Sequence, residues 1–305
     1  TDDTVKKFIE VKHLKKRRLT EYIACKEGVE IPPEFLVFSQ VKRLHEYKRQ
    51  LMTAFAVLEL YYGIKDGSLR ELRPCAFVFG AKSAPSYRRA KTIIKFINEI
   101  AEKINSDPQT NDRLKVVFVK NYNVSYAEKI VAGTDVSLQV STAGLEASGT
   151  GNMKFMMNGA VTCGTMDGAN IEIVERAGLE NNYIFGATVN EIADLKKTGY
   201  VPVKCIADTV HGRAVESLVD GTFSDGGSGE FKQLYDSLLN DGDPDRYFVL
   251  YDLDGYVRTL IRICEDYADE TAFARKQLNN VANSAYFSSD RTIKEYAEEI
   301  WRIER

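Results

Sequence analysis

The chain has 305 residues, of which 44% are apolar and 28% charged, ordinary values for a globular protein that argue against disorder. Its 41 basic and 44 acidic residues give a net charge of −3, so no bulk basicity favours nucleic acid or an anionic membrane. At about 150 residues per domain, the length allows two domains or one large α/β unit.

The chain shows no sign of a membrane or secretory protein. No apolar run approaches the ~18 residues that cross a bilayer, and the opening residues lack the regions of a signal peptide. Five cysteines are scattered without CxxC spacing, which favours free thiols in a reducing compartment over disulfides or zinc. We therefore expect a cytoplasmic protein without a metal site.

The first 30 residues are expected to be a helical lead-in, followed by a main domain over residues 31–305. The helix is predicted over residues 5–27, and Pro32-Pro33 marks the entry to the main domain because it forces an extended backbone. Seven basic residues between positions 6 and 18 oppose the single acid Glu10. They are interpreted as a solvated helix face, or as one that packs on a segment outside this chain.

Short apolar strands then alternate with segments of helical length. Such alternation is typical of βαβ units, so we predict an α/β fold, a Rossmann-like parallel sheet with helices on both faces. Ligands are then expected at the carboxyl ends of the strands. The predicted strands are Phe35–Phe38, Cys75–Gly80, Leu114–Lys120, Val136–Val140, Ala160–Gly164 and Tyr183–Gly186, and the predicted helices are Glu46–Ile64, Ser86–Ile104, Ser125–Ala132 and residues 152–158.

The pattern changes in the last third of the chain. Asp220–Gly229 is rich in glycine, serine and aspartate and has no period, so it is predicted to be a surface loop. Beyond Pro244 the segments are predicted to be helical to the end, over residues 246–268, 270–282 and 290–303.

A glycine-rich turn over Ala147–Gly151 follows a predicted strand and opens a short predicted helix. Small residues let the backbone approach a ligand, and the N–H groups of a first helical turn can hold an anion. The Rossmann fingerprint needs a glycine where Lys154 stands, and the P-loop ending is absent. The turn alone therefore leaves a phosphate site and a structural turn both open.

A second cluster, Val41–Arg49, follows the first strand. Its four basic residues stand beside a helix amino terminus, where the local dipole disfavours cations. Such a concentration is understandable if a multiply charged anion lies nearby. Parallel strands bring residues 40–48 and 147–154 to one sheet edge, which predicts a pocket with room for more than one phosphate. The four basic residues are Lys42, Arg43, Lys48 and Arg49.

These stretches resemble one family. The chain from about residue 35 onward is similar to the C-terminal domain of the α-glucan phosphorylases, which include glycogen, starch and maltodextrin phosphorylases, and Glu146–Lys154 is the most specific match. The resemblance implies that the main domain is the Rossmann-like cofactor-binding domain of a two-domain GT-B-type glycosyltransferase with a helical end. The segments that carry it are Val41–Gln50, Asn121–Lys129, Ser141–Ala160, Gly164–Asn170 and Tyr296–Trp301.

The resemblance implies pyridoxal 5'-phosphate as the cofactor, bound covalently through the amine of Lys154. It places Thr150, Gly151 and Lys42 on the cofactor phosphate, with Gly149 and Tyr122 completing the cofactor pocket. Arg43 and Lys48 are then expected to hold the substrate phosphate. Lys42, Arg43 and Lys48 are accordingly the predicted catalytic residues, because two phosphates in contact require cations to offset their repulsion.

The implied reaction is phosphorolysis of a terminal α-1,4-glucosidic bond, which releases glucose 1-phosphate with retention of configuration. No carboxylate pair is required, since the substrate phosphate protonates the leaving oxygen. The loop residues Glu146, Ala147, Ser148 and Gly149, with Tyr47, are expected to bind the glucosyl unit. Gly164–Asn170 is interpreted as a structural loop beneath the site, and His45 as a structural residue.

The expected partners are an α-1,4-glucan, inorganic phosphate, glucose 1-phosphate and an N-terminal phosphorylase domain outside this sequence, in a parent enzyme that is a homodimer. We expect the chain alone to fold but to be nearly inactive. Two rivals stay open: a nucleotide-sugar glycosyltransferase of the same architecture, and a non-catalytic carbohydrate-binding module. An imine-forming lysine at position 154 has no use in such a transferase, so Lys154 distinguishes a phosphorylase from a nucleotide-sugar glycosyltransferase.

Overall fold

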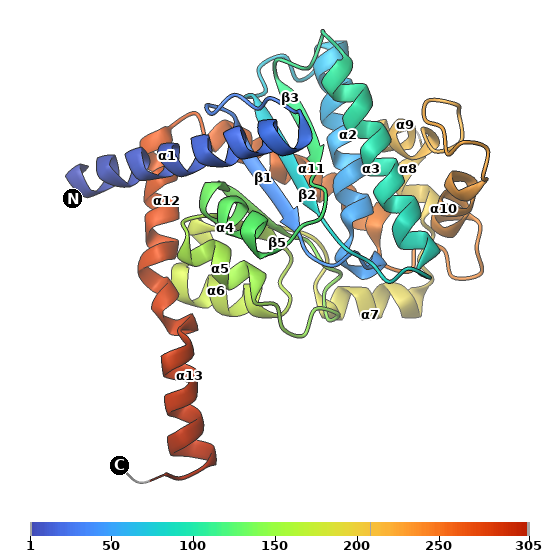
Figure 1. Ribbon diagram of the computed structural model, residues 1–305. Helices are drawn as coiled ribbons and strands as arrows, with labels where there is room; N and C mark the ends of the chain where they lie inside the picture. Colours follow the sequence, from blue (N-terminus) through green and yellow to red (C-terminus); the bar gives the residue numbers. More distant parts are fainter. Residues whose placement is uncertain (1, 208, 304–305) are drawn as a thin grey trace.

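A computed structural model describes residues 2–207 and 209–303, and its centre is a six-stranded sheet (Figure 1). Every neighbouring pair is parallel, which confirms the α/β class and the Rossmann-like parallel sheet. The strand order is β3-β2-β1-β4-β5-β6. The strands are β1 (Leu36–Val41), β2 (Cys75–Gly80), β3 (Leu114–Phe118), β4 (Val136–Gln139), β5 (Val161–Gly164) and β6 (Tyr183–Ile184).

This order makes β1 and β4 neighbours at the centre of the sheet. Phe38 pairs with Val136 and Ser39 with Ser137. The chain runs outward from β1 to β3 on one side and from β4 to β6 on the other, so the order reverses between β1 and β4. In open α/β sheets, the crevice at the carboxyl ends of two such strands is where ligands bind.

Helices cover the sheet and extend beyond it. The α-helices are α1 (Asp2–Glu27), α2 (Gln50–Asp66), α3 (Arg88–Ser106), α4 (Val124–Gly133), α5 (Gly151–Met157), α6 (Ala169–Ala177), α7 (Val189–Thr198), α8 (Val203–Ile206), α9 (Val210–Glu216), α10 (Glu230–Leu239), α11 (Val249–Asp266), α12 (Glu270–Asn283) and α13 (Ser289–Glu295). Short helical turns are η1 (Glu46–Lys48), η2 (Leu179–Asn181), η3 (Ser284–Phe287) and η4 (Tyr296–Ile300), the last a π-helical turn. None of these helices combines the length and apolarity that a bilayer crossing needs.

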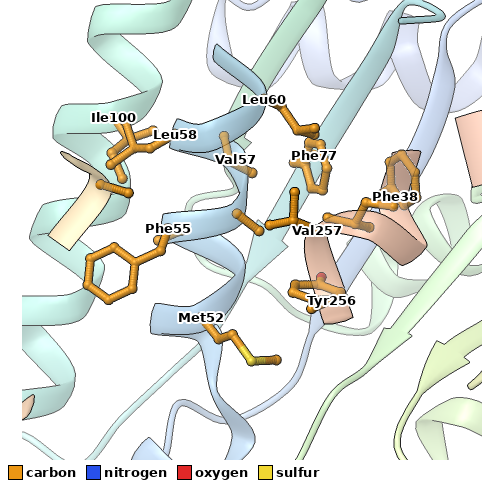
Figure 2. Close-up of a cluster of buried hydrophobic side chains, with 14 of the residues drawn as sticks. Phe38, Met52, Phe55, Val57, Leu58, Leu60, Phe77, Ile100, Tyr256 and Val257 are labelled. Atoms are coloured by element: carbon orange, nitrogen blue, oxygen red, sulfur yellow. The ribbon is translucent and has the colours of Figure 1, made fainter. Parts of the chain in front are cut away.

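Successive strand residues serve two separate cores, as the pleat of a strand requires. Phe38 of β1 stacks on Phe77 of β2 with ring centroids 4.7 Å apart, and both pack among α2, α3 and α11 (Figure 2). Val37 belongs to the opposite core, with side chains from α1, α4 and α5. Helices therefore lie on both faces, which explains why β1 and β2 are apolar and buried along their whole length.

Several element boundaries differ from the sequence prediction. The helix predicted over Glu46–Ile64 is broken at Arg49, whose φ of 55° separates η1 from α2. The last predicted helix, over residues 290–303, is α13 followed by η4, and it extends away from the sheet (Figure 1). Asp220–Gly229 has no helix or strand, as predicted.

The interpretation of the basic residues in α1 is wrong for Lys12 and Lys16. Both are buried, at 5% and 1% exposure, because α1 packs against α4 and α12. The Lys12 ammonium donates to the carbonyls of Ala132, Thr134 and Asn158, where α4 and α5 end. A cation there complements two helix carboxyl termini.

Lys16 is bound to the sheet by a buried ion pair. Its ammonium lies 2.6 Å from the Asp135 carboxylate and donates to the Tyr267 hydroxyl and the Phe35 carbonyl. Asp135 in turn accepts a hydrogen bond from the N–H of Val37 in β1. Burial acts to lower the pKa of Lys16, but Asp135 and Tyr267 outweigh it, so its pKa is raised and the ammonium stays charged.

Replacing Lys16 by methionine should lower the free energy of unfolding by about 3–5 kcal/mol, because it leaves the Asp135 carboxylate buried without a cation. Arg17→Met, at an exposed position of the same helix, is the matched control and should change stability by less than about 0.5 kcal/mol. Urea denaturation of both variants measures this. Equal stabilities would contradict the role of the ion pair.

Candidate functional site

The candidate site lies where the loops after β1 and β4 meet. Thr142 of the second loop donates through its N–H to the Tyr47 carbonyl, at 2.9 Å, and through its hydroxyl to the Tyr247 carbonyl, at 2.8 Å. The adjacent strands β1 and β4 bring these loops together at Tyr47 and Thr142. The predicted approach of residues 147–154 to residues 40–48 stays a prediction.

Lys48 and Glu146 form an ion pair across these two loops. The Lys48 ammonium lies 2.9 and 2.8 Å from the two carboxylate oxygens, and both side chains are largely buried. Lys48 also lies over the Tyr47 ring, 5.2 Å from its centroid. A cation and an anion predicted to bind different parts of a substrate therefore stand side by side.

Lys42 provides a second cation near this pair. Burial lowers the pKa of Lys42 to about 8, while the Glu146 carboxylate opposes that shift and the Lys48 ammonium adds to it. No hydrogen bond joins its ammonium to another described residue, and the side chain is partly exposed at the edge of the site. A desolvated cation without an acceptor favours an anionic ligand.

The two arginines of the basic cluster differ from each other in burial. Arg43 has an exposed side chain at the same sheet edge, where it is open to a ligand. Arg49 is fully buried, and its guanidinium pairs with Asp252 at 2.6 Å and donates to the Val140 and Ser141 carbonyls. The interpretation of Arg49 as part of an anion-binding cluster is therefore wrong, since its charge is already neutralised inside the fold.

The aromatic neighbours of the cluster pack together. The His45 ring lies 5.8 Å from each of the Tyr47 and Tyr87 ring centroids, and the Tyr87 hydroxyl donates to Glu46 at 2.7 Å. This packing supports the structural interpretation of His45. Tyr47 keeps a partly exposed ring at the edge of the site.

The loop after β4 leads into α5, which carries Lys154. Ala147, Ser148 and Thr150 are exposed and Gly149 is partly so. The N–H groups of Gly151 and Asn152 have no protein acceptor in residues 2–207 and 209–303, and a Cβ at Gly151 would meet nothing within 4 Å. Open space and free N–H groups therefore lie where the phosphate site was predicted.

Lys154 and Tyr122, the other predicted cofactor residues, come from separate elements. Lys154 is exposed on α5, and no hydrogen bond joins its amine to another described residue. Tyr122 is half-buried beside Gly80 at the end of β2, and burial raises the pKa of its phenol. No contact joins Lys154 directly to Lys42, Arg43 or Lys48 among the described residues.

Sequence reasoning assigned no individual role to Asp167, which lies beneath the site. Its buried carboxylate accepts from the N–H groups of Gly144 and Glu146, both at 2.8 Å, and from the Ser141 hydroxyl at 3.1 Å. The turn Gly164–Asn170 therefore supports the loop, as predicted for a structural segment. An aspartate directly before a glycine was the available signal, since that pair is typical of tight turns.

Comparison with known proteins identifies what the chain resembles. A model of the carbohydrate phosphorylase family matches residues 1–303. Similar proteins include a glycogen phosphorylase of Bacillus subtilis, 45% identical over 98% of this chain, and one of Synechocystis, 45% identical over 97%. The liver form of human glycogen phosphorylase is 42% identical over 99% of the chain. The chain spans 35–37% of the length of these three relatives.

Gly168→Ala should displace the loop that carries Glu146. Gly168 has a φ of 51°, and a Cβ there would lie 2.1 Å from the Glu146 carbonyl oxygen. Gly221→Ala is the matched control, because Gly221 also has a positive φ, 87°, but an open surrounding. Thermal and urea denaturation should show that Gly168→Ala costs about 2 kcal/mol more than the control. Equal losses would contradict the close approach.

Proposed function

The chain belongs to the carbohydrate phosphorylase family, and from this premise we propose that it forms the C-terminal, cofactor-binding part of a cytoplasmic α-1,4-glucan phosphorylase. The proposed reaction is phosphorolysis of terminal α-1,4-glucosyl residues to glucose 1-phosphate, with retention. The observation that carries the proposal is the convergence of Lys42, Arg43, Lys48 and the Glu146–Gly151 loop at the reversal point of a parallel sheet.

The residues fit pyridoxal 5'-phosphate as the cofactor. Lys42 supplies a desolvated cation without a protein acceptor, Gly151 and Asn152 supply free N–H groups, and Lys154 supplies an accessible amine on the same helix turn. Thr150, Gly149 and Tyr122 complete the proposed pocket. When bound, the cofactor would supply an acidic phosphate group to the reaction.

The chain's own residues have distinct tasks in this mechanism. Arg43 and Lys48 orient the substrate phosphate and offset its charge, which increases as the glycosidic bond breaks. Glu146, Ala147, Ser148, Gly149 and Tyr47 bind the glucosyl hydroxyls and orient the anomeric carbon toward that phosphate. Because Glu146 holds Lys48 at 2.8 Å, the glucosyl and phosphate subsites share one ion pair and are proposed to bind their ligands in a coupled manner.

Turnover is proposed to require a further N-terminal domain, in an enzyme that assembles as a homodimer. The chain spans only 35–37% of its relatives' length, which supports a site completed by other residues. The exposure of Lys154, Thr150 and Ser148 also supports this, since a phosphorolysis site has to exclude water. We therefore expect negligible glucose 1-phosphate release from the chain alone.

Cofactor capture tests the proposal on the chain itself. After incubation with pyridoxal 5'-phosphate and borohydride reduction, peptide mapping should find Lys154 labelled far more than Lys91, an exposed lysine on α3. Pyridoxal without its phosphate should label the two equally, because only the phosphate recognises Lys42 and the free N–H groups. Absence of label from Lys154 would favour a nucleotide-sugar transferase or a non-catalytic binding module.

Anion binding should weaken as the pH rises through about 8, because Lys42 loses its proton there. The ammonium form predominates below this pKa, so sulfate, which does not titrate in this range, should bind at least about tenfold more weakly at pH 9.5 than at pH 7. Calorimetry at constant ionic strength measures this. Lys42→Met should bind weakly with little dependence on pH, and a parallel decline in both proteins would contradict the assignment.

A further inference from the structure

The loop that carries the glucosyl-binding residues has few backbone contacts of its own. Between Ser141 and Thr150, the N–H groups that donate to backbone carbonyls are those of Thr142, which reaches the Tyr47 carbonyl, and Leu145, which reaches the Thr142 carbonyl. The segment contains no helix or strand, and half of its ten residues are exposed. Something other than regular secondary structure must therefore hold it in place.

Asp167 supplies that support. Its two carboxylate oxygens accept from Gly144 and Glu146 at 2.8 Å and from Ser141 at 3.1 Å, while the residue itself is 6% exposed. Hydrogen bonds to an ionised acceptor are shorter and stronger than neutral ones. All three donors lie in the loop, so one carboxylate determines the path of its first half.

The turn containing Asp167 is itself held from two directions. Asn170 donates to the Gln139 carbonyl at the end of β4 and accepts from Asn152 in α5, at 3.0 and 3.1 Å. Thr165 donates to the Ser141 carbonyl at 2.7 Å. One turn therefore joins the end of β4, the loop and the helix that carries Lys154.

We propose that Asp167 is a positioning residue for glucosyl recognition. It holds the backbone N–H groups of Gly144 and Glu146 and thereby orients the loop that continues into Ala147 and Ser148, without touching the substrate. This inference rests on the proposed function, because it assumes that the loop binds the glucosyl unit. If the inference is right, two ligands depend differently on Asp167. Glucose 1-phosphate needs both the loop and the cations, whereas sulfate needs only the cations and the N–H groups.

The test compares Asp167→Asn with the unchanged chain and with Asp225→Asn. Asp225 is the matched control, because its carboxylate also accepts three hydrogen bonds from its own loop, from the N–H groups of Gly227, Ser228 and Phe231, and that loop has no predicted site residues. An asparagine has one acceptor oxygen and turns its amide donors toward an N–H group that they cannot bind. Hydrogen exchange measures the loop over residues 141–149, and calorimetry measures binding of glucose 1-phosphate and of sulfate.

In Asp167→Asn we expect faster exchange over residues 141–149 and at least about tenfold weaker binding of glucose 1-phosphate, with sulfate affinity within twofold of the unchanged chain. The control should alter neither affinity. A general structural defect would weaken both ligands equally, and this result, or unchanged binding of glucose 1-phosphate, would overturn the proposal. If the asparagine variant does not fold, the same measurements are made on Asp167→Glu, which keeps the charge but moves it by one methylene.

Failure of the proposed function gives a different result. If the unchanged chain binds glucose 1-phosphate no better than sulfate, the glucosyl assignment of the loop is wrong, and the inference falls with it whatever the variants do. If the unchanged chain prefers glucose 1-phosphate and Asp167→Asn keeps that preference with unchanged exchange in the loop, the proposed function stands and only the role of Asp167 is refuted.

Discussion

The buried guanidinium of Arg49 is the interaction around which the site is assembled. It is fully enclosed and donates to the Val140 and Ser141 carbonyls, the Phe248 carbonyl and the Asp252 carboxylate, while Asp252 also accepts from the N–H of Ala187. A buried charge must keep its partners, because an unpaired one costs several kcal/mol. The chain after β1, β4 and β6 is thereby joined to α11 in one arrangement.

Above this ion pair the site combines rigid support with unsatisfied polar groups. Asp167 holds the loop from below, and Gly168 lets its turn approach the Glu146 carbonyl closely. The Lys42 ammonium and the N–H groups of Gly151 and Asn152 have no protein partners among the described residues. Groups that cost free energy when unpaired, on a fixed frame, are what an anion site requires.

Helix α1 connects this frame to the opposite face of the sheet. Lys16 pairs with Asp135, which holds Val37 of β1, and Lys12 joins the carboxyl ends of α4 and α5. Lysines that a charge count assigns to solvent therefore support the sheet and the helix of Lys154. Their burial is possible because each ammonium donates to carbonyl, carboxylate or hydroxyl oxygens.

The parallel α/β class and most of the elements could be predicted from the sequence, because short apolar runs such as Cys75–Gly80 alternate with segments of helical length, as is typical of βαβ units. The sequence also located the Glu146–Lys154 loop and the basic cluster, since glycine turns and local charge are properties of neighbouring residues. The burial of Arg49, Lys12 and Lys16 became evident only once the chain was folded. The tertiary structure alone paired Lys48 with Glu146 and placed Asp167 beneath the loop. Each of these partners lies far away along the chain, and no local pattern encodes which distant oxygen a cation will reach once the strands have been ordered.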